Sequence, residues 1–434
     1  MNYLKNFFLV LILALLVFPS LQKRFNFISS GSLKGLFQLQ EKPVFSMNSW
    51  FSGTYQEQCQ KYRDDQPGFR PDFIRLFNQI DYSFFSLPHA AKINASKNGY
   101  LFGDQYIEAW LGTDFMGEKY IEQKVRQVKY LQDFLWEKKK ILLLVIFTPD
   151  KGTFYQDMIP DRYLSKKQEV NNYTFYAKKC QEAGINVIDF NSLFLRMKDT
   201  SKYILYPKTG VHWSTYGAVI AADSLTRYLS KKLGIRLPEM VIDSIILSNV
   251  PRDEDDDITR TMNLVFPVSQ PSLAYPVYHF RSDSTVKKPA ALFIGDSFYW
   301  NWYNPGIIKN LFSNDAFWYY DKEVYPINPT RPLNTGLIDL KSNIEKQDVI
   351  ILMQVNGGEG DLGYGFVDRA FPEYDTAKDN PVRMIEATMR NSRDYMKMLA
   401  KKAKDWNVTL DAMIRIDANY INNQGLLQKS QHKK

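Results

Sequence analysis

The sequence predicts an α/β fold in which helices cover a parallel sheet, and two observations predict it. Four short apolar runs occur at residues 141–147, 185–190, 290–294 and 348–355. Runs of this kind, apolar on both faces, are typical of strands buried inside a parallel sheet. Helical segments separate the runs from about residue 118 to 360, and this alternation favours parallel strands joined by helical crossovers.

The N-terminus carries a candidate membrane segment. Residues 7–18 contain no charge, follow Lys5, and are followed by Pro19 and then Lys23 and Arg24. This length is in the range of a signal peptide and falls short of the ~20 residues that comfortably span a bilayer. No small-x-small cleavage site follows. We therefore expect residues 1–24 to be an uncleaved signal anchor rather than a cleaved signal peptide, with the rest of the chain on the periplasmic or extracytoplasmic side of the cell inner membrane.

Three further segments follow the N-terminal one. Residues 25–48 are predicted to be a linker, 49–378 the α/β domain and 379–434 a helical region broken near 407–411. Within the domain, the pattern predicts helix over 55–85 with interruptions at Pro67 and Pro71, a turn and short strand at 98–103, and helix over 118–139.

Composition excludes several classes of function. The net charge of +8 is spread over lysine-rich segments such as 137–140 and 401–404, without a nucleic-acid motif, so we expect no nucleic-acid partner. Anionic lipid headgroups or acidic glycans suit this charge equally well. Cys59 and Cys180 show no CxxC spacing, which excludes thiol metal sites and leaves their pairing open. The acidic run 252–257 lacks the spacing of a calcium loop and is interpreted as a solvated loop. No metal or cofactor is predicted.

The candidate nucleophile is Ser297. It follows the apolar run 290–294 in a Gly295-Asp296-Ser297 turn, at the carboxyl end of a predicted strand, where active residues of such sheets gather. A serine needs a base, and the chain has only four histidines. His212 precedes Trp213 and Ser214 at the start of an amphipathic helix. We therefore predict His212 as the general base.

The ordered motifs resemble those of SGNH-hydrolase-like proteins of the alginate O-acetyltransferase (AlgX/AlgJ) type. The resemblance covers about residues 50–360 and places the histidine before the serine, as in this permuted branch. It implies an SGNH-like parallel sheet flanked by helices, a Ser297 acyl-enzyme, His212 as base, and transfer of acetyl groups to polysaccharide hydroxyls outside the cytoplasm. The segments that carry it are Asn98-Gly99-Tyr100-Leu101-Phe102, Pro149-Asp150-Lys151 with Tyr155 and Ile159-Pro160, Val187-Ile188-Asp189, His212-Trp213, and Gly295-Asp296-Ser297-Phe298.

The sequence departs from the family at one position. Where the family has an aspartate two residues before the histidine, this chain has Gly210. That acid orients the imidazole, and its loss costs about 10⁴-fold in triad enzymes where it was tested. Three alternatives remain: a Ser-His dyad, an acid from elsewhere such as Asp189, or a chain that binds its polymer or partner without turnover.

The remaining site residues are candidates only. The backbone N–H of Asp296 or Ser297 is the expected oxyanion donor, with the Asn356 side chain as a weaker candidate. Trp213 could wall a sugar site or belong to the core. The prediction is an extracytoplasmic O-acetyltransferase acting on a cell-envelope polysaccharide, with a membrane-bound O-acyltransferase as the acetyl-donor partner. A catalytically silent accessory or glycan-binding protein of such a complex, or a carbohydrate esterase, is the alternative.

Overall fold

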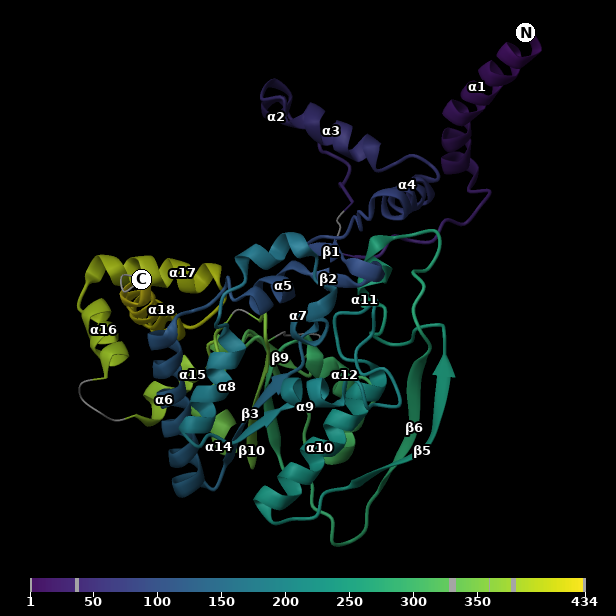
Figure 1. The fold of residues 1–434 in the computed structure, drawn as a ribbon. Coiled ribbons are helices and arrows are strands. Elements are labelled where there is room, and N and C mark those ends of the chain that lie inside the picture. The colour runs from purple at the N-terminus through teal and green to yellow at the C-terminus, as the bar shows by residue number, and fades with distance from the viewer. Residues whose placement is uncertain (1, 36–38, 328–332, 359, 376–379, 432–434) are drawn as a thin grey trace. The chain divides into compact units, whose positions relative to one another are not determined.

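The structure is a computed structural model that describes residues 2–35, 39–327, 333–358, 360–375 and 380–431. The chain forms two compact units. One comprises residues 1–95 and 256–269, and the other comprises 96–255 and 270–434 (Figure 1). The predicted site residues all lie in the second unit.

The first unit is helical. It begins with α1 (Asn2–Phe25), whose residues 3–25 form the one helix in the described part of the chain that is long and apolar enough to cross a membrane, with mean hydropathy 2.2. Pro67 lies in the break between α3 and α4, as the sequence predicts, whereas Pro71 lies in the first turn of α4 and does not interrupt it. The remaining elements are α2 (Met47–Phe51), α3 (Thr54–Asp64), α4 (Arg70–Phe85), β1 (Ile93–Ala95) and α11 (Asp257–Met262).

The second unit is built on a six-stranded sheet with the order β4-β3-β10-β7-β8-β9. The first five strands are parallel, and β9 pairs antiparallel with β8 at one edge. The predicted strands occur within two residues of their expected positions. The sheet comprises β3 (Leu142–Thr148), β4 (Val187–Asp189), β7 (Ala291–Gly295), β8 (Ala316–Tyr319), β9 (Glu323–Tyr325) and β10 (Val349–Val355).

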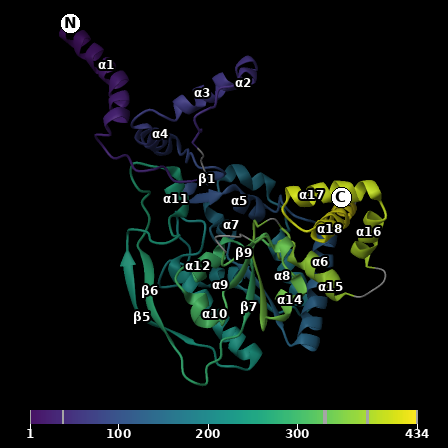
Figure 2. The same ribbon diagram turned by 180° about the vertical axis from the view of Figure 1, so that it is seen from behind.

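Helices cover both faces of this sheet, as Figure 2 shows from behind. Alternate residues of β3 point to opposite faces: Leu142, Leu144 and Ile146 belong to the core on the side of α9, while Leu143 and Val145 belong to the core on the side of α6. Both faces are therefore apolar, which explains the uninterrupted apolar runs in the sequence. The covering helices are α6 (Glu118–Phe134), α8 (Asn172–Glu182), α14 (Leu340–Glu345) and α15 (Phe366–Tyr374) on one face, and α9 (Phe190–Met197), α10 (Thr215–Leu233), α12 (Trp300–Tyr303) and α13 (Ile307–Leu311) on the other.

The sequence did not predict one large element, and it predicted fewer helices in the C-terminal region than the structure has. An antiparallel ribbon of β5 (Glu239–Ser248) and β6 (Leu273–Arg281) lies along α10, and its strands are mostly exposed on one side. The C-terminal region folds as three helices with their own small core, α16 (Pro381–Arg390), α17 (Arg393–Asp405) and α18 (Leu410–Gln431). The predicted break at 407–411 separates α17 from α18, and a second break at 391–392 was not predicted.

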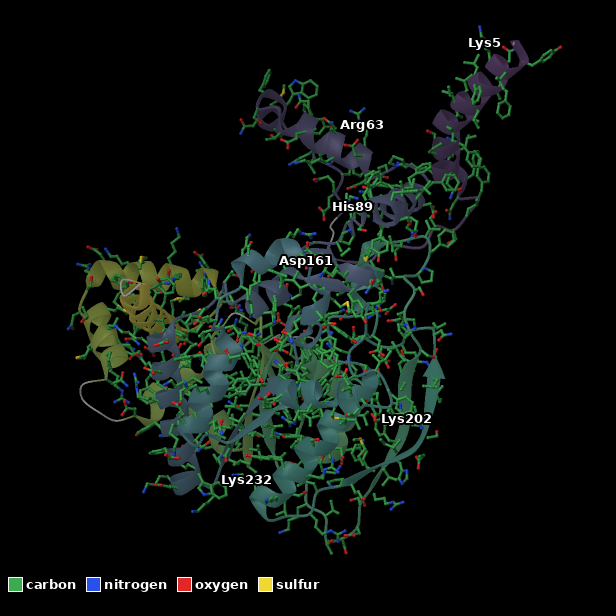
Figure 3. The ribbon with its side chains drawn as sticks, in the orientation of Figure 1. Lys5, Arg63, His89, Asp161, Lys202 and Lys232 are labelled. Atoms are coloured by element: carbon green, nitrogen blue, oxygen red, sulfur yellow. The ribbon has the colours of Figure 1, made fainter. Side chains whose placement is uncertain are left out.

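Short elements connect these layers. They are η1 (Lys97–Gly99), β2 (Leu101–Gly103), α5 (Asp104–Leu111), the π-helical turn η2 (Leu135–Lys139), α7 (Lys151–Phe154), η3 (Gln156–Met158), η4 (Asp161–Lys166), η5 (Ser297–Tyr299) and η6 (Thr335–Leu337). Cys59 and Cys180 are both free. The lysine excess is displayed at the surface, as the exposed Lys202 and Lys232 illustrate (Figure 3).

Candidate active site

Ser297 stands at the carboxyl end of a central strand. It is separated from β7 by Asp296 alone and opens the short helical turn η5, and the residue is half-buried. β7 pairs with β10 on one side and β8 on the other. An ideal Cβ built on Gly295 would lie 2.9 Å from the Met353 carbonyl oxygen. Glycine at 295 thus lets β10 approach the strand that carries the nucleophile.

Asp296 fixes the turn that presents Ser297. Its fully buried carboxylate accepts hydrogen bonds from the N–H of Phe298 at 3.0 Å, the N–H of Val355 at 3.0 Å and the hydroxyl of Tyr364 at 2.6 Å. Burial raises the pKa of this carboxyl, while the three hydrogen bonds and the nearby His212 offset part of the rise. Asp296 therefore ties the turn to the end of β10.

His212 meets Ser297. The imidazole Nε2 lies 2.8 Å from Ser297 Oγ, within hydrogen-bond reach of a serine–base pair. The ring is 8% exposed and packs edge-on against the Phe298 ring, at 4.8 Å between centroids. The two residues that the sequence singled out, 85 positions apart, are brought into one site.

His212 lies in an irregular segment, residues 204–214, between α9 and α10; we call it the histidine loop. Ser214 caps α10 through the Gly217 N–H, and its hydroxyl donates back to the Ile204 carbonyl at 2.6 Å. The Tyr206 hydroxyl donates to the Val211 carbonyl, and Thr209 Oγ1 donates to the Asp255 carbonyl at 3.1 Å. This loop has no regular secondary structure, and hydrogen bonds from side chains fix its conformation instead.

Gly210 is packed where an aspartate would have to sit. A Cβ at this position would lie 2.9 Å from the Asp255 carbonyl oxygen, 2.9 Å from Pro207 Cγ and 3.0 Å from the Glu254 carbonyl oxygen. The backbone conformation of Gly210 is not left-handed, so space rather than φ excludes a side chain. The backbone of residues 254–255 therefore leaves no room for a side chain at position 210.

The acidic run 252–257 is less solvated than predicted at one position. Asp255 is fully buried, and its carboxylate accepts from the N–H of Thr215 at 3.1 Å and from the Thr215 hydroxyl at 3.2 Å, at the start of α10. Burial raises the pKa of this carboxyl to about 7. Asp255 is thus a structural partner of the helix that follows His212, which corrects the interpretation of the run as a solvated loop.

Three predicted site residues have structural roles away from the reacting pair. Trp213 is fully buried among Phe190, Phe194, Phe298 and Trp302, so it belongs to the core and cannot wall a sugar site. The other two are Asn356 and Asp189.

Asn356 donates through Nδ2 to the buried carboxylate of Asp150 at 3.3 Å, so this amide is engaged with a carboxylate rather than left open for an oxyanion. Asp189 lies on β4, separated from β7 by β3 and β10. Its carboxylate caps α9 through the Ser192 N–H at 2.8 Å and accepts from the Tyr173 hydroxyl at 2.9 Å. The structure thus gives Asp189 a capping role at the far side of the sheet.

Sequence reasoning gave no role to the residues that hold the site together, although Asp150 lies in one of the motifs. Asp150 is fully buried at the end of β3, where it caps α7 and accepts from Asn191 and Asn356, and burial raises its pKa. Tyr364 gave no signal in the sequence, because its contact with Asp296 joins positions 68 residues apart. In the described part of the chain, no group of three or more His, Cys, Asp or Glu side chains could hold a metal ion.

Comparison with known proteins identifies the class. Residues 93–266 match the family model of the SGNH hydrolase-like domain of the acetyltransferase AlgX, a span that includes His212 and ends before Ser297. Residues 93–266 thus match an SGNH hydrolase-like domain, which confirms the resemblance that the motifs indicate. No curated protein matches the chain.

Three solved structures are among those similar to the chain. The O-acetyltransferase domain of Pseudomonas putida AlgJ is 13% identical, covering 62% of this chain and 92% of its own, with a TM-score of 0.41. Pseudomonas aeruginosa AlgX is 16% identical, covering 66% and 68%, with a TM-score of 0.43. Bacillus cereus PatB1 with a sulfonyl adduct is 12% identical, covering 56% and 91%, with a TM-score of 0.37.

Proposed function

We propose that this chain is an O-acetyltransferase that acts on a cell-envelope polysaccharide through an acyl-enzyme on Ser297. The observation that carries the proposal is the 2.8 Å contact between Ser297 Oγ and His212 Nε2 at the carboxyl end of β7. The match to an acetyltransferase family domain supports acetyl as the transferred group.

The chemistry proceeds in two transfers. Ser297 Oγ attacks the carbonyl carbon of an acetyl ester while its proton moves to His212 Nε2, and the donor alcohol leaves with that proton. A glycan hydroxyl then attacks the acetyl-serine, passes its proton to His212, and takes the acetyl group as Ser297 regains a proton from the imidazole. Water in place of the glycan gives esterase activity instead.

Backbone N–H groups of the nucleophile turn are the proposed oxyanion donors. Ser297 opens η5, and the first N–H groups of a helical turn have no partner within that turn. They are rigidly placed because the Asp296 carboxylate holds Phe298 and the end of β10. Preorganised donors of this kind are each worth about 10²–10³ in rate.

Gly210 shapes the proposed mechanism. Since the backbone of residues 254–255 leaves no room for a side chain at position 210, the fixed histidine loop orients the His212 imidazole toward Ser297. A hydrogen-bonded loop restricts the ring's position in the way that the missing carboxylate restricts it elsewhere.

The proposed location is extracytoplasmic, with α1 as the anchor. Residues 3–25 have the length and hydropathy of a membrane-crossing helix. The proposed acceptor is a polysaccharide outside the cytoplasm, and the proposed acetyl donor is a membrane-bound O-acyltransferase in the same membrane.

The experiment incubates the full chain in detergent with 4-nitrophenyl acetate, with and without purified envelope polysaccharide, and measures both acetylated glycan and free acetate. Acetyl-glycan that depends on Ser297 supports the transferase. Ser297→Ala should abolish the transfer, whereas Ser313→Ala, at an exposed serine after α13, should not change it.

Two outcomes overturn the proposal in favour of its alternatives. Free acetate released at the same rate with and without glycan indicates a carbohydrate esterase. A folded chain that neither hydrolyses the ester nor acetylates glycan indicates an accessory or glycan-binding protein.

A further inference from the structure

Lys151 is a fully buried lysine beside the histidine loop. It is the first residue of α7, directly after the end of β3, and its ammonium donates to the Lys208 carbonyl at 2.8 Å and to the Gly210 carbonyl at 2.6 Å. The Nζ atom also lies 5.7 Å from the centre of the Phe102 ring. A buried charge is costly unless it is well solvated by fixed partners. These two carbonyls therefore bind the Lys151 ammonium in strong, directional hydrogen bonds.

The two carbonyls bracket the turn that leads to His212. The Lys208 carbonyl also accepts the Leu101 N–H at 3.3 Å, so it is held from two directions. The Gly210 carbonyl lies two residues before the imidazole. One ammonium thus joins the start and the end of the segment 208–210, and a shift of that segment would move the His212 ring.

The family motifs converge on this same loop. Leu101 and Phe102 come from the Asn98–Phe102 motif, Lys151 from the Pro149–Lys151 motif, and Tyr155 donates its hydroxyl to the Tyr206 carbonyl at 2.7 Å. No residue of these two motifs touches Ser297 among the contacts given above. Their shared feature is contact with the backbone of the histidine loop.

The backbone under Lys151 is fixed by close packing. A Cβ on Gly152 would lie 2.1 Å from the Tyr106 carbonyl oxygen, so α7 sits directly against α5. The Asp150 side chain caps α7 through the Thr153 N–H at 2.7 Å. The backbone that carries Lys151 is therefore fixed, so its ammonium can hold the loop carbonyls at a fixed position.

We propose that Lys151 is a positioning residue for the general base: its ammonium clamps the carbonyls of residues 208 and 210 and so sets the place of the His212 imidazole. The clamp acts on the backbone, whereas the family's aspartate acts on the ring itself. This inference rests on the proposed role of His212 as the base for Ser297.

The test measures acetylation of Ser297 by 4-nitrophenyl acetate in the full chain, by stopped-flow release of nitrophenol at a range of ester concentrations. Lys151→Met keeps an unbranched apolar side chain, one atom shorter than lysine, and removes the donors. We expect the maximal acylation rate to fall by about tenfold to a hundredfold, the cost of misplacing a reacting group by a fraction of an ångström to 1 Å, with KM within about twofold of the parent.

The matched control is Lys124→Met. Lys124 is the other lysine that is at most 2% exposed in the described part of the chain, and it pairs with Asp361 at 2.8 Å and Asp368 at 2.6 Å, away from the histidine loop. This variant should lower Tm without changing the acylation rate of the folded fraction. A rate loss that is specific to Lys151 separates positioning from general stability.

Lys151→Gln provides the second variant, because its amide keeps N–H donors on a side chain one bond shorter. Its acylation rate should lie between those of the parent and Lys151→Met. A folded Lys151→Met or Lys151→Gln protein that acylates as fast as the parent overturns the clamp and leaves the Ser297–His212 pair intact. A parent that is never acylated overturns the proposed function itself.

Discussion

The nucleophile turn and the histidine loop carry the two halves of one site, yet they are built in different ways. The turn at residues 295–299 is a short continuation of a central strand, capped by its own Asp296 through the Phe298 N–H. The loop at residues 204–214 has no regular structure and is held by side chains from other segments, including Lys151 and Tyr155.

This difference indicates which part of the site is more easily disturbed by substitution. A strand end with local capping is specified by a few consecutive residues, and it forms whenever the sheet forms. The loop depends on contacts that span 51 to 59 residues in the sequence, and an unpaired buried carbonyl costs about 1–3 kcal/mol. We expect substitutions in the turn to lower both the stability of the fold and the rate of acylation. We expect substitutions around the loop to act mainly by displacing His212.

Asp296→Asn should have the largest effect, because it weakens the link between the turn and β10. An amide cannot accept from Val355, Phe298 and Tyr364 as a carboxylate does. We expect a loss of about 2–4 kcal/mol in the free energy of unfolding and about tenfold to a hundredfold in acylation rate. Urea unfolding and ester kinetics measure the two.

Its matched control is Asp339→Asn. Asp339 is exposed and caps α14 through the Ser342 N–H at 2.7 Å, a role that asparagine performs equally well. This variant should change neither stability nor rate. An Asp296→Asn protein that behaves like it would mean that the turn is held by the strand alone.

Gly210→Asp restores the family's acid in the sequence but should not restore a triad. Its Cβ would meet the backbone of Asp255 and Glu254 at about 3 Å, so the loop must move. Overpacking of this kind costs about 1–3 kcal/mol. We expect a lower Tm and no gain in ester hydrolysis. Gly425→Asp, where a side chain would meet nothing within 4 Å, is the control. A folded Gly210→Asp protein that hydrolyses faster than its parent would contradict the account of this position.

One substitution can be made in both regions for direct comparison. Tyr155→Phe in the loop's support removes the hydrogen bond to the Tyr206 carbonyl and should cost about 1–2 kcal/mol, with a several-fold slower acylation. Tyr299→Phe at the turn removes a buried hydroxyl that has no hydrogen-bond partner among the described residues, and it should be neutral or slightly stabilising. Thermal unfolding of the two variants side by side checks this; equal losses would mean that the Tyr155 hydrogen bond contributes no more than the unpaired Tyr299 hydroxyl.

The smallest expected effect is a pH dependence at the start of α10. Burial raises the pKa of Asp255 to about 7, against about 3.9 in an unfolded chain. A raised pKa means that the folded state binds the proton more tightly, so this stability is present at low pH and is lost as pH rises through 7. Relative to Asp255→Asn, the parent should lose about 1 kcal/mol in unfolding free energy between about pH 6 and 7.5.

The exposed Asp405, at the end of α17, supplies the control for this measurement, since Asp405→Asn should follow the parent at each pH. A parent curve parallel to that of Asp255→Asn would show that the carboxyl of Asp255 does not titrate in this window.

The sequence predicted the elements that short-range patterns specify and missed those that depend on distant partners. The four apolar runs became β3, β4, β7 and β10, because strands buried on both faces need no polar positions. The β5–β6 ribbon escaped notice since one of its sides is exposed and its residues are mixed.

The candidate site shows the same division. Ser297 and His212 were predicted because each lies in a recognisable local motif, and the structure brings them to 2.8 Å. Trp213 was open between two roles because its burial among Phe190, Phe194 and Trp302 is a property of the folded core. The sequence could not predict that the backbone of residues 254–255 packs against Gly210, because the two segments lie far apart in the chain.

The most direct test of the central claim is the mass of the full chain after brief exposure to 4-nitrophenyl acetate, followed by peptide mapping. The account predicts one added acetyl group on Ser297, absent in Ser297→Ala and formed at least about 10³-fold more slowly in a folded His212→Ala protein. Acetyl found on another residue, or His212→Ala labelled on Ser297 as fast as the parent, would contradict the claim that these two side chains form one catalytic pair.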